Sequence, residues 1–301
     1  MIKIGTRESK LALWQAEQVQ AALLQQGHAS ELVLVKSEGD IDLVTPLYEM
    51  GVQGVFTRTL DAALLNKRID IAVHSMKDVP TQLPQGIVQA AVLPRGFTED
   101  VLVYKESPSF FTDAQQPMTI GTSSIRRKAQ WLYKYRHTSF HNMRGNMQTR
   151  LDKLAESDWS GAIFARAGLD RIGLLPQHHL VLDWMLPAPA QGAVMVVCRE
   201  EDAHTMDACA LINDEFTAVC TKIERDFLRG LMGGCATPIS AFAQHNYSHV
   251  SFTGNVCMPD GSDLLEVSCT FGLDELEDAG HIAAEKLLAN GGGAFIEKFN
   301  K

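Results

Sequence analysis

The sequence predicts an α/β protein with two similar lobes and a small α+β domain at its C-terminus. Its 301 residues exceed the usual size of one domain, so two or three domains are expected. Strand-like apolar runs alternate with helical patterns along most of the chain, which is typical of α/β folds. The expected boundaries are 1–96 with 192–212 for the first lobe, 97–191 for the second lobe and 213–301 for the C-terminal domain.

The first lobe is expected to begin with a strand over residues 2–5 and a helix over residues 9–26. Apolar residues recur at helical spacing in the second segment, Ser9 can cap its N-terminus, and Gly27 stands where a C-terminal glycine belongs. The other elements expected here are a strand over 32–35, a helix over 57–66 and a strand over 69–73. The stretch 37–56 has weak periodicity and is interpreted as a mobile lid, with an undetected strand or helix as the alternative.

The second lobe repeats this plan with little shared sequence. Ile-Gly-Thr occurs at 4–6 and again at 120–122, each time before a helix that contains a tryptophan, and the strand at 70–75 has a counterpart at 161–166. If the lobes face each other across a cleft, the two Ile-Gly-Thr turns lie opposite one another. Such strand-to-helix turns offer backbone N–H groups and positive helix ends to an anion, although ordinary N-capping explains either turn alone.

The C-terminal segment predicts a small α+β domain that carries an isolated cysteine. After a Pro-rich crossover at 187–192, a strand over 193–198 is interpreted as returning to the first lobe. A helix from residue 214 leads to Gly-Gly-Cys at 233–235. The remaining elements are strands near 241–244, 250–256 and 264–270, a hairpin turn at 259–262 and a last helix over 274–290.

The composition indicates a globular protein of the cytoplasm. Hydrophobic residues make up 46% of the chain and charged residues 21%. No apolar run approaches the ~20 residues of a membrane-spanning helix, and the amino terminus lacks the pattern of a signal peptide. A net charge of −9 disfavours nucleic-acid binding. The six cysteines form no Cys-x-x-Cys pair, so no metal site is expected.

Basic residues nevertheless cluster in the second lobe. The cluster consists of Arg126, Arg127, Lys128, Arg144, Arg150, Arg166 and Arg171. A local cationic pocket in an acidic protein indicates a small polyanionic ligand, with solvated helix faces as the alternative.

Two motifs carry side chains that can react. The segment 73–80 places Lys77 and Asp78 at the carboxyl end of a buried strand, where ligands bind in open α/β sheets. Asp78 is a candidate acid or base, and closing a turn is its alternative role. His74 is interpreted as a satisfied packing histidine. Cys235 lies in a glycine-bounded loop where a reagent can reach its thiol, although an incidental loop cysteine fits the same pattern.

Several longer motifs follow one another along the chain. They are Gly-Thr-Arg-Glu-Ser-Lys-Leu-Ala-Leu-Trp-Gln-Ala (5–16), Ile-Ala-Val-His-Ser-Met-Lys-Asp-Val-Pro (71–80), Gly-Thr-Ser-Ser-Ile-Arg-Arg (121–127), Arg-Gly-Asn (144–146), Ala-Gly-Leu (167–169), Pro-Ala-Gln-Gly-Ala (189–193) and Gly-Gly-Cys (233–235). In this order they resemble the hydroxymethylbilane synthases over nearly the whole chain. The resemblance implies two periplasmic-binding-protein-like lobes and a third domain that carries a dipyrromethane cofactor in thioether linkage to a cysteine, here Cys235.

The resemblance also implies a reaction in tetrapyrrole and haem biosynthesis. Four porphobilinogens, each with an acetate and a propionate, are joined head to tail to the cofactor with loss of ammonia. Hydrolysis then releases hydroxymethylbilane. The enzyme is expected to be a monomeric transferase with porphobilinogen as its substrate, and arginines suit a ligand that carries so many carboxylates.

By resemblance, each candidate residue has an expected role. The catalytic residues are Asp78, Arg7 and Lys77. The cofactor contacts are Cys235, Lys77, Asp78, Thr122, Ser123, Ser124, Arg126, Arg127, Arg144 and Gly145. The substrate contacts are Arg7, Ser9, Arg144, Arg150, Arg171 and Gln191. Asp78 is expected to stabilise the azafulvenium cation left by each loss of ammonia and to accept the ring proton after carbon–carbon bond formation.

Departures from the family's pattern lie in the lid. Where Gly-Gly-Lys-Gly-Leu-Phe is common, this chain has Gly-Val-Gln-Gly-Val-Phe at 51–56, and Glu38 stands where an arginine is frequent. Gln53 and Glu38 thus remove positive charge, whereas Arg58 keeps the charge of a common lysine. The lid's substrate contacts are therefore left open.

The residues alone also fit two other classes of protein. One is a two-lobed binding protein that captures a polyanion without chemistry. The other is a hydrolase with Cys235 as nucleophile and His74 as its base, which requires a preorganised thiol–histidine pair.

Overall fold

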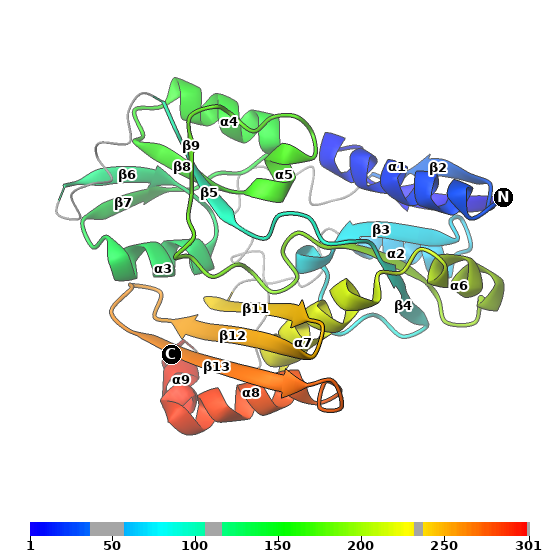
Figure 1. Cartoon of the computed structure of the whole chain (residues 1–301). Helices are drawn as coiled ribbons and strands as arrows, with labels where there is room; N and C mark the ends of the chain where they lie inside the picture. The colour runs from blue at the N-terminus through cyan, green and yellow to red at the C-terminus, as the bar shows by residue number, and fades with distance from the viewer. Residues whose placement is uncertain (37–56, 106–115, 232–236, 300–301) are drawn as a thin grey trace. The chain divides into compact units, whose positions relative to one another are not determined.

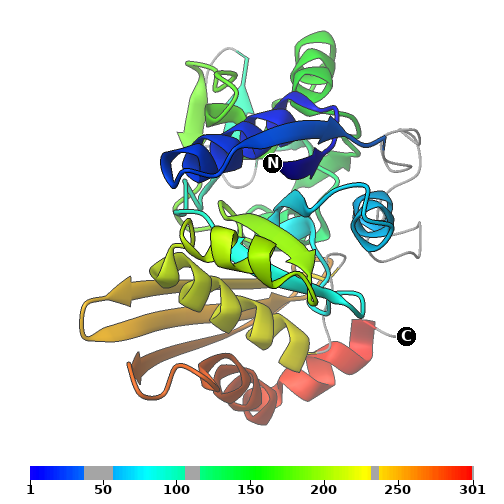
Figure 2. The ribbon, with the colours of Figure 1, turned by 90° about the vertical axis from the view of Figure 1, so that its right-hand side faces the viewer.

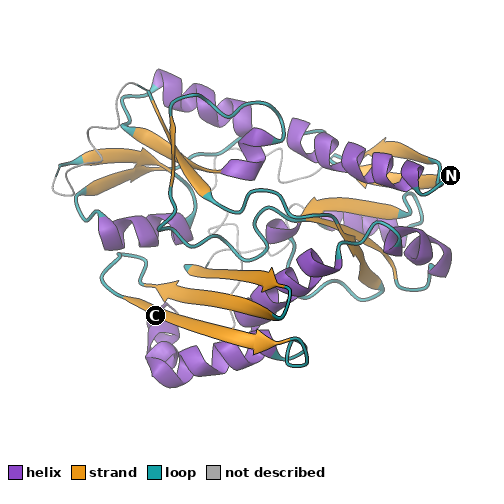
Figure 3. Ribbon diagram, viewed as in Figure 1, coloured by secondary structure: helices purple, strands orange, loops and turns teal. Residues whose placement is uncertain are grey.

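A computed structural model describes residues 1–36, 57–105, 116–231 and 237–299 of the chain. The described residues contain three sheets, two of five strands and one of three strands (Figures 1 and 3). They divide into two compact units: residues 1–36, 57–96 and 191–219 form the first unit, and residues 97–105, 116–190, 220–231 and 237–299 form the second. Cys235, Glu38 and Gln53 lie outside the described residues.

The first unit is built on a mixed sheet with the strand order β2-β1-β3-β10-β4. The strands β1 (Ile2–Thr6), β2 (Ser30–Leu34) and β3 (Ile71–Ser75) are parallel. The strand β10 (Val194–Arg199) is antiparallel to both β3 and β4 (Ile87–Val92). Because β10 joins this sheet, the predicted return of the chain to the first lobe is confirmed.

Three of the described helices lie wholly in this unit: α1 (Lys10–Gln25), α2 (Arg58–Leu65) and α6 (Ala203–Ala210). Apolar residues of α1 and α6 share one core cluster with alternate residues of the strands, so both helices cover the same face of the sheet. The predicted ends of α1 are confirmed, since the Ser9 hydroxyl accepts a hydrogen bond from the Ala12 amide and Gly27 has a φ of +83°. The strand β4 and the helix α6 were not expected.

A second mixed sheet opens the other unit and has the order β7-β6-β8-β5-β9. The strands β6 (Met118–Gly121), β7 (Thr138–His141) and β8 (Gly161–Ala165) are parallel, whereas β5 (Asp100–Tyr104) is antiparallel to β8 and to β9 (His179–Val181). Its helices are α3 (Ile125–Lys134), α4 (Met147–Glu156) and α5 (Arg166–Asp170). Three parallel strands followed by two antiparallel pairings occur in both sheets, which confirms the predicted repeat of one plan.

The C-terminal sheet is an antiparallel meander of β11 (Ile239–Asn246), β12 (His249–Cys257) and β13 (Leu264–Gly272). Figure 2 shows α7 (Glu215–Gly230) running across this sheet. Phe227 of this helix packs on Phe252 of β12 at a ring-centroid distance of 5.0 Å. The hairpin turn at 259–262 is as predicted: Gly261 has a φ of +69°, and an added Cβ there would lie 2.5 Å from backbone atoms of α3.

The last helix begins later and ends later than predicted. Residues 273–278 form turns because the Gly272 amide donates to the Glu275 carboxylate at 2.8 Å, and α8 runs only over Ala279–Leu287. A π-helical segment with a break at Gly291, whose φ is +102°, follows over Leu288–Gly292, and α9 (Gly293–Phe299) is the last described element. Among the described helices, none combines the length and the apolarity needed to cross a bilayer.

His74 is buried in β3 as predicted, but the expectation that its ring is satisfied is wrong for one nitrogen. The Nε2 atom is buried and has no hydrogen-bond partner among the described residues. Burial, and secondarily the charge of Arg7, lowers the pKa of His74 to about 4.

This depressed pKa predicts a loss of stability in mild acid. The folded protein holds the His74 ring in its neutral form, whereas the unfolded chain can protonate it below a pKa of about 6.5. The free energy of unfolding should therefore fall by roughly 3 kcal/mol as the pH drops from about 6.5 to about 4. Urea unfolding of wild type and His74→Gln at several pH values in that range checks this. The variant should show a smaller fall, and an equal fall in both proteins would contradict the assignment.

Candidate active site

The parallel strands of the first unit deliver three predicted catalytic residues to one sheet edge. Strands β1 and β3 pair in register at Ile4–Ile71, so both leave the sheet at the same carboxyl edge. Arg7 follows β1 directly and is half-buried. Lys77 and Asp78 follow β3 in the short 3₁₀ turn Met76–Asp78. This edge is where ligands bind in sheets of this kind.

Asp78 ends that turn with its side chain exposed. The turn is closed by the backbone, since the Val79 amide donates to the Met76 carbonyl at 3.1 Å. The Asp78 carboxylate forms no hydrogen bond or ion pair with any described residue. The turn is thus closed by main-chain atoms and not by the Asp78 side chain.

The Lys77 ammonium group is held by the buried side-chain amide of Gln191. Its Nζ donates to Oε1 of Gln191 at 3.2 Å, and Gln191 itself is 1% exposed. The Gln191 carbonyl in turn accepts from Nε of Arg95 at 2.9 Å, and the Arg95 amide donates to Thr217. Gln191 was predicted to contact substrate, and in the structure its side-chain oxygen holds the lysine ammonium.

The second unit presents the same kind of edge. Strands β6, β7 and β8 are parallel, and the segments that follow them contain Thr122–Ser124, Arg144–Gly145 and Arg166, respectively. The Ser123 hydroxyl donates to the Met143 carbonyl at 2.8 Å and accepts from the Met143 amide at 2.7 Å. Two of the three loops are thereby fixed to each other.

The remaining predicted residues of this edge are mostly engaged with the backbone. Ser124 caps α3 by accepting from the Arg127 amide, and Thr122 accepts from the Ser124 amide at 3.2 Å. Nε of Arg150 donates at 2.8 Å to the carbonyl of Gly145, whose φ of +108° suits glycine. Two further predicted contacts of this unit are Arg144, which is buried, and Arg171, whose pKa is lowered by burial. Ser9, a predicted contact in the first unit, caps α1.

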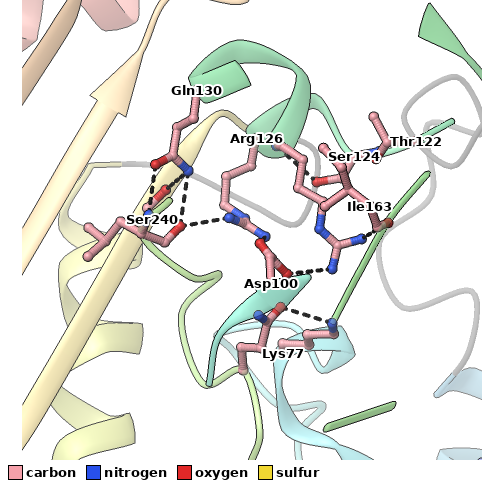
Figure 4. A network of polar contacts seen from close by, with 11 residues as sticks. Lys77, Asp100, Thr122, Ser124, Arg126, Gln130, Ile163 and Ser240 are labelled. Carbon is pink, nitrogen blue, oxygen red and sulfur yellow. Dashed lines mark hydrogen bonds and ion pairs between the residues drawn. The ribbon is translucent and has the colours of Figure 1, made fainter. Parts of the chain in front are cut away.

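Arg126 and Arg127 share one buried carboxylate, which belongs to Asp100 at the start of β5. Figure 4 shows the Arg126 side chain next to Asp100. The N–O distances to the carboxylate are 2.6 Å from Arg126 and 2.8 Å from Arg127. Asp100 is fully buried, and the arginines are 5% and 7% exposed. Although burial alone would raise the pKa of Asp100, the two cations hold it well below its ordinary value. The carboxylate is therefore ionised at any physiological pH.

Further bonds fix both arginines in place. The Arg126 guanidinium donates to the Leu186 carbonyl at 2.7 Å and that of Arg127 to the Ile163 carbonyl at 3.1 Å. One turn along α3, the Gln130 amide group donates to the same Leu186 carbonyl and to Ser240 at 2.9 Å (Figure 4). Sequence reasoning missed both Asp100 and Gln130. The sequence signal that could have identified Asp100 is its position as an acidic residue directly before the apolar run 101–103.

The donors of this unit fit a ligand with several carboxylates. One carboxylate carries a single negative charge against the two guanidinium charges that it holds, so the Arg126–Arg127 pair keeps a net positive charge. Nε of Arg127 is also buried with no hydrogen-bond partner among the described residues. A carboxylate-rich group would supply the missing negative charge.

Asp100→Asn should destabilise the protein by about 3–5 kcal/mol, because two buried guanidinium groups lose their counter-charge. Urea unfolding checks this, with Asp152→Asn on the exposed face of α4 as the matched control. The depressed pKa also means that the stability given by Asp100 is present above the unfolded pKa of about 3.9 and is lost as the pH falls below it. A loss no larger than that of the control would show that the pair is not sustained by Asp100.

Comparison with known proteins identifies the family. A model described as "Porphobilinogen deaminase, dipyromethane cofactor binding domain" matches residues 2–207, and the model of the C-terminal domain of the same enzyme matches residues 218–289. A periplasmic substrate-binding protein of an ABC transporter from Coxiella burnetii aligns over 72% of this chain and 94% of its own, with 14% identity and a TM-score of 0.44.

Full-length relatives carry the same name. The chloroplastic porphobilinogen deaminase of Oryza sativa is 41% identical over 99% of this chain and 86% of its own length. The enzymes of Syntrophotalea carbinolica and Moorella thermoacetica are each 40% identical, over 96% and 99% of this chain and 93% and 96% of their own lengths. The chain therefore belongs to the porphobilinogen deaminase family, transferases of tetrapyrrole biosynthesis that use a dipyrromethane cofactor.

Proposed function

We propose that this chain joins four porphobilinogens head to tail on a dipyrromethane held by Cys235, and then releases hydroxymethylbilane by hydrolysis. The observation that carries the proposal is the match of both family models, which together span residues 2–207 and 218–289. The arrangement of cations at the two sheet edges supports it. We propose further that the protein acts as a monomer, as the resemblance implies, and in the cytoplasm, as the composition indicates.

Asp78 is the group proposed to act on the reacting atoms. Its exposed carboxylate has no described partner to neutralise it, so it can stabilise the azafulvenium cation that substrate becomes on losing ammonia. The same oxygen can accept the ring proton once the new bond has formed. Lys77, steadied by Gln191, and Arg7 at the neighbouring strand end would bind substrate carboxylates beside it.

The second unit is proposed to bind the primer and the growing chain. When bound, the dipyrromethane supplies the pyrrole carbon to which the first substrate is joined. Arg126 and Arg127, with the hydroxyls at 122–124, Arg144 and Gly145, would hold its carboxylates, and the basic side chains of Arg150 and Arg171 would hold those of substrate. In the first unit, Ser9 and Gln191 are the further proposed substrate contacts. Because Asp100 fixes the guanidinium planes before ligand arrives, the site is preorganised.

A hydrolase with Cys235 as its nucleophile and His74 as its base fits the structure less well. The imidazole is buried in β3, and its pKa of about 4 makes it a weak base at neutral pH. A pure binding protein would also have no need of the dipyrromethane cofactor that the model matching residues 2–207 names.

Replacing the cofactor-bearing thiol tests the covalent part of the proposal. Cys235→Ser should give folded protein that lacks the added mass of the primer and has no activity, because a hydroxyl is a much poorer nucleophile than a thiolate. Intact mass spectrometry checks this, with Cys269→Ser, a partly exposed cysteine of β13, as the control that keeps the primer. A normally loaded Cys235→Ser would rule out the attachment site.

Asp78→Asn separates catalysis from binding. The amide keeps the shape of the side chain but not its charge or basicity, so turnover should fall by about 10²- to 10⁴-fold. Primer loading and capture of porphobilinogen should persist, since the cationic residues remain. Stopped-flow or discontinuous measurement of ammonia release checks the rate, with Asp207→Asn on the exposed side of α6 as the control. Ammonia release within tenfold of wild type would return Asp78 to a structural role.

A further inference from the structure

Arg166 occupies the third strand end at the carboxyl edge of the second unit and has no role in the function proposed above. It follows β8 directly, and β8 is parallel to β6, whose following loop begins at Thr122. In the first unit the equivalent strand, β3, leads into Lys77 and Asp78. We propose that Arg166 binds a carboxylate of the growing pyrrole chain, an inference that rests on the proposed function for the identity of that ligand.

The hydrogen-bonding capacity of Arg166 is largely unused. Among the described residues its guanidinium makes one bond, from NH1 to Oε1 of Glu99 at 3.3 Å, which is long for a charge-assisted pair. Its Nε is buried and has no hydrogen-bond partner among those residues. Arg126, by contrast, makes bonds of 2.6 and 2.7 Å. A ligand carboxylate that reaches the partly exposed guanidinium would bind the terminal N–H groups that the protein leaves largely unused.

An aromatic ring holds the guanidinium in place without using those donors. Cζ of Arg166 lies 3.5 Å from the ring centroid of Phe97, a cation–π contact in which the ring face attracts the charge. The N–H groups are not consumed by such a contact. Phe97 is itself 39% exposed, so the pair lies at the surface of the unit.

Glu99 acts as an exchangeable counter-ion for this arginine. The two side chains are 36% and 24% exposed, and pairs of this kind contribute little to stability. The Arg166 amide also donates to the Glu99 carbonyl at 3.0 Å, which keeps the two residues together. An incoming ligand carboxylate can therefore replace the Glu99 carboxylate at small cost.

Two variants that should change kcat/KM in opposite directions distinguish a ligand site from a structural ion pair. Arg166→Gln should lower kcat/KM for porphobilinogen by about tenfold or more, because a charged hydrogen bond to the ligand is lost. Glu99→Gln should raise kcat/KM by about two- to fivefold, because the arginine loses its competing partner. Arg136→Gln, an exposed arginine after α3, is the matched control and should match wild type. A structural pair would give losses of the same sign in both variants.

Intact mass spectra taken after limiting porphobilinogen give a second readout. Arg166→Gln should accumulate proteins with fewer added pyrroles than wild type, at unchanged primer loading and unchanged thermal midpoint. Equal pyrrole distributions, or a fall in kcat/KM for Glu99→Gln, would overturn the proposal. If Arg166→Gln fails to fold, the sign of the Glu99→Gln change decides alone. Failure of the proposed function is distinct, since wild type itself would then lack both primer and turnover.

Discussion

Two consecutive guanidinium groups can be buried only if a negative charge is buried with them. Asp100 meets this requirement for Arg126 and Arg127, and the cost of desolvating three ions is offset by short bonds between them and to the Leu186 and Ile163 carbonyls. The carboxylate comes from β5 and the arginines from α3, so the ion cluster also fixes that helix against its sheet. The site in this unit depends on that attachment.

A single constraint of topology places the rest of the candidate residues. Parallel strands all end at one edge, and each five-stranded sheet has three of them. Side chains that are distant in sequence are gathered at that edge with no need for long, specially shaped loops. The antiparallel strands β10 and β5 occupy the same position in the two sheets, so both edges are built on the same plan.

Much of this architecture was predictable because its signals are local. Ser9, Gly27 and Gly261 act within a few residues of their own positions, and all three predictions are confirmed. Asp100 was not predictable, because its partners lie 26 and 27 residues away and on another element. The start of the last helix was misplaced because Glu275 bonds the Gly272 amide and forms a turn where the sequence allowed a helix. Cys235, which the family pattern singled out, lies outside the described residues.

The two turns of the C-terminal sheet differ sharply as points for protein engineering. The turn between β12 and β13 contacts the backbone of α3, where even the methyl group of an alanine at Gly261 would collide with main-chain atoms. The turn between β11 and β12 instead carries Tyr247, whose side chain is 97% exposed. A fluorophore, an affinity tag or an inserted reporter domain therefore belongs at Tyr247, where it leaves the packing of both neighbouring strands intact.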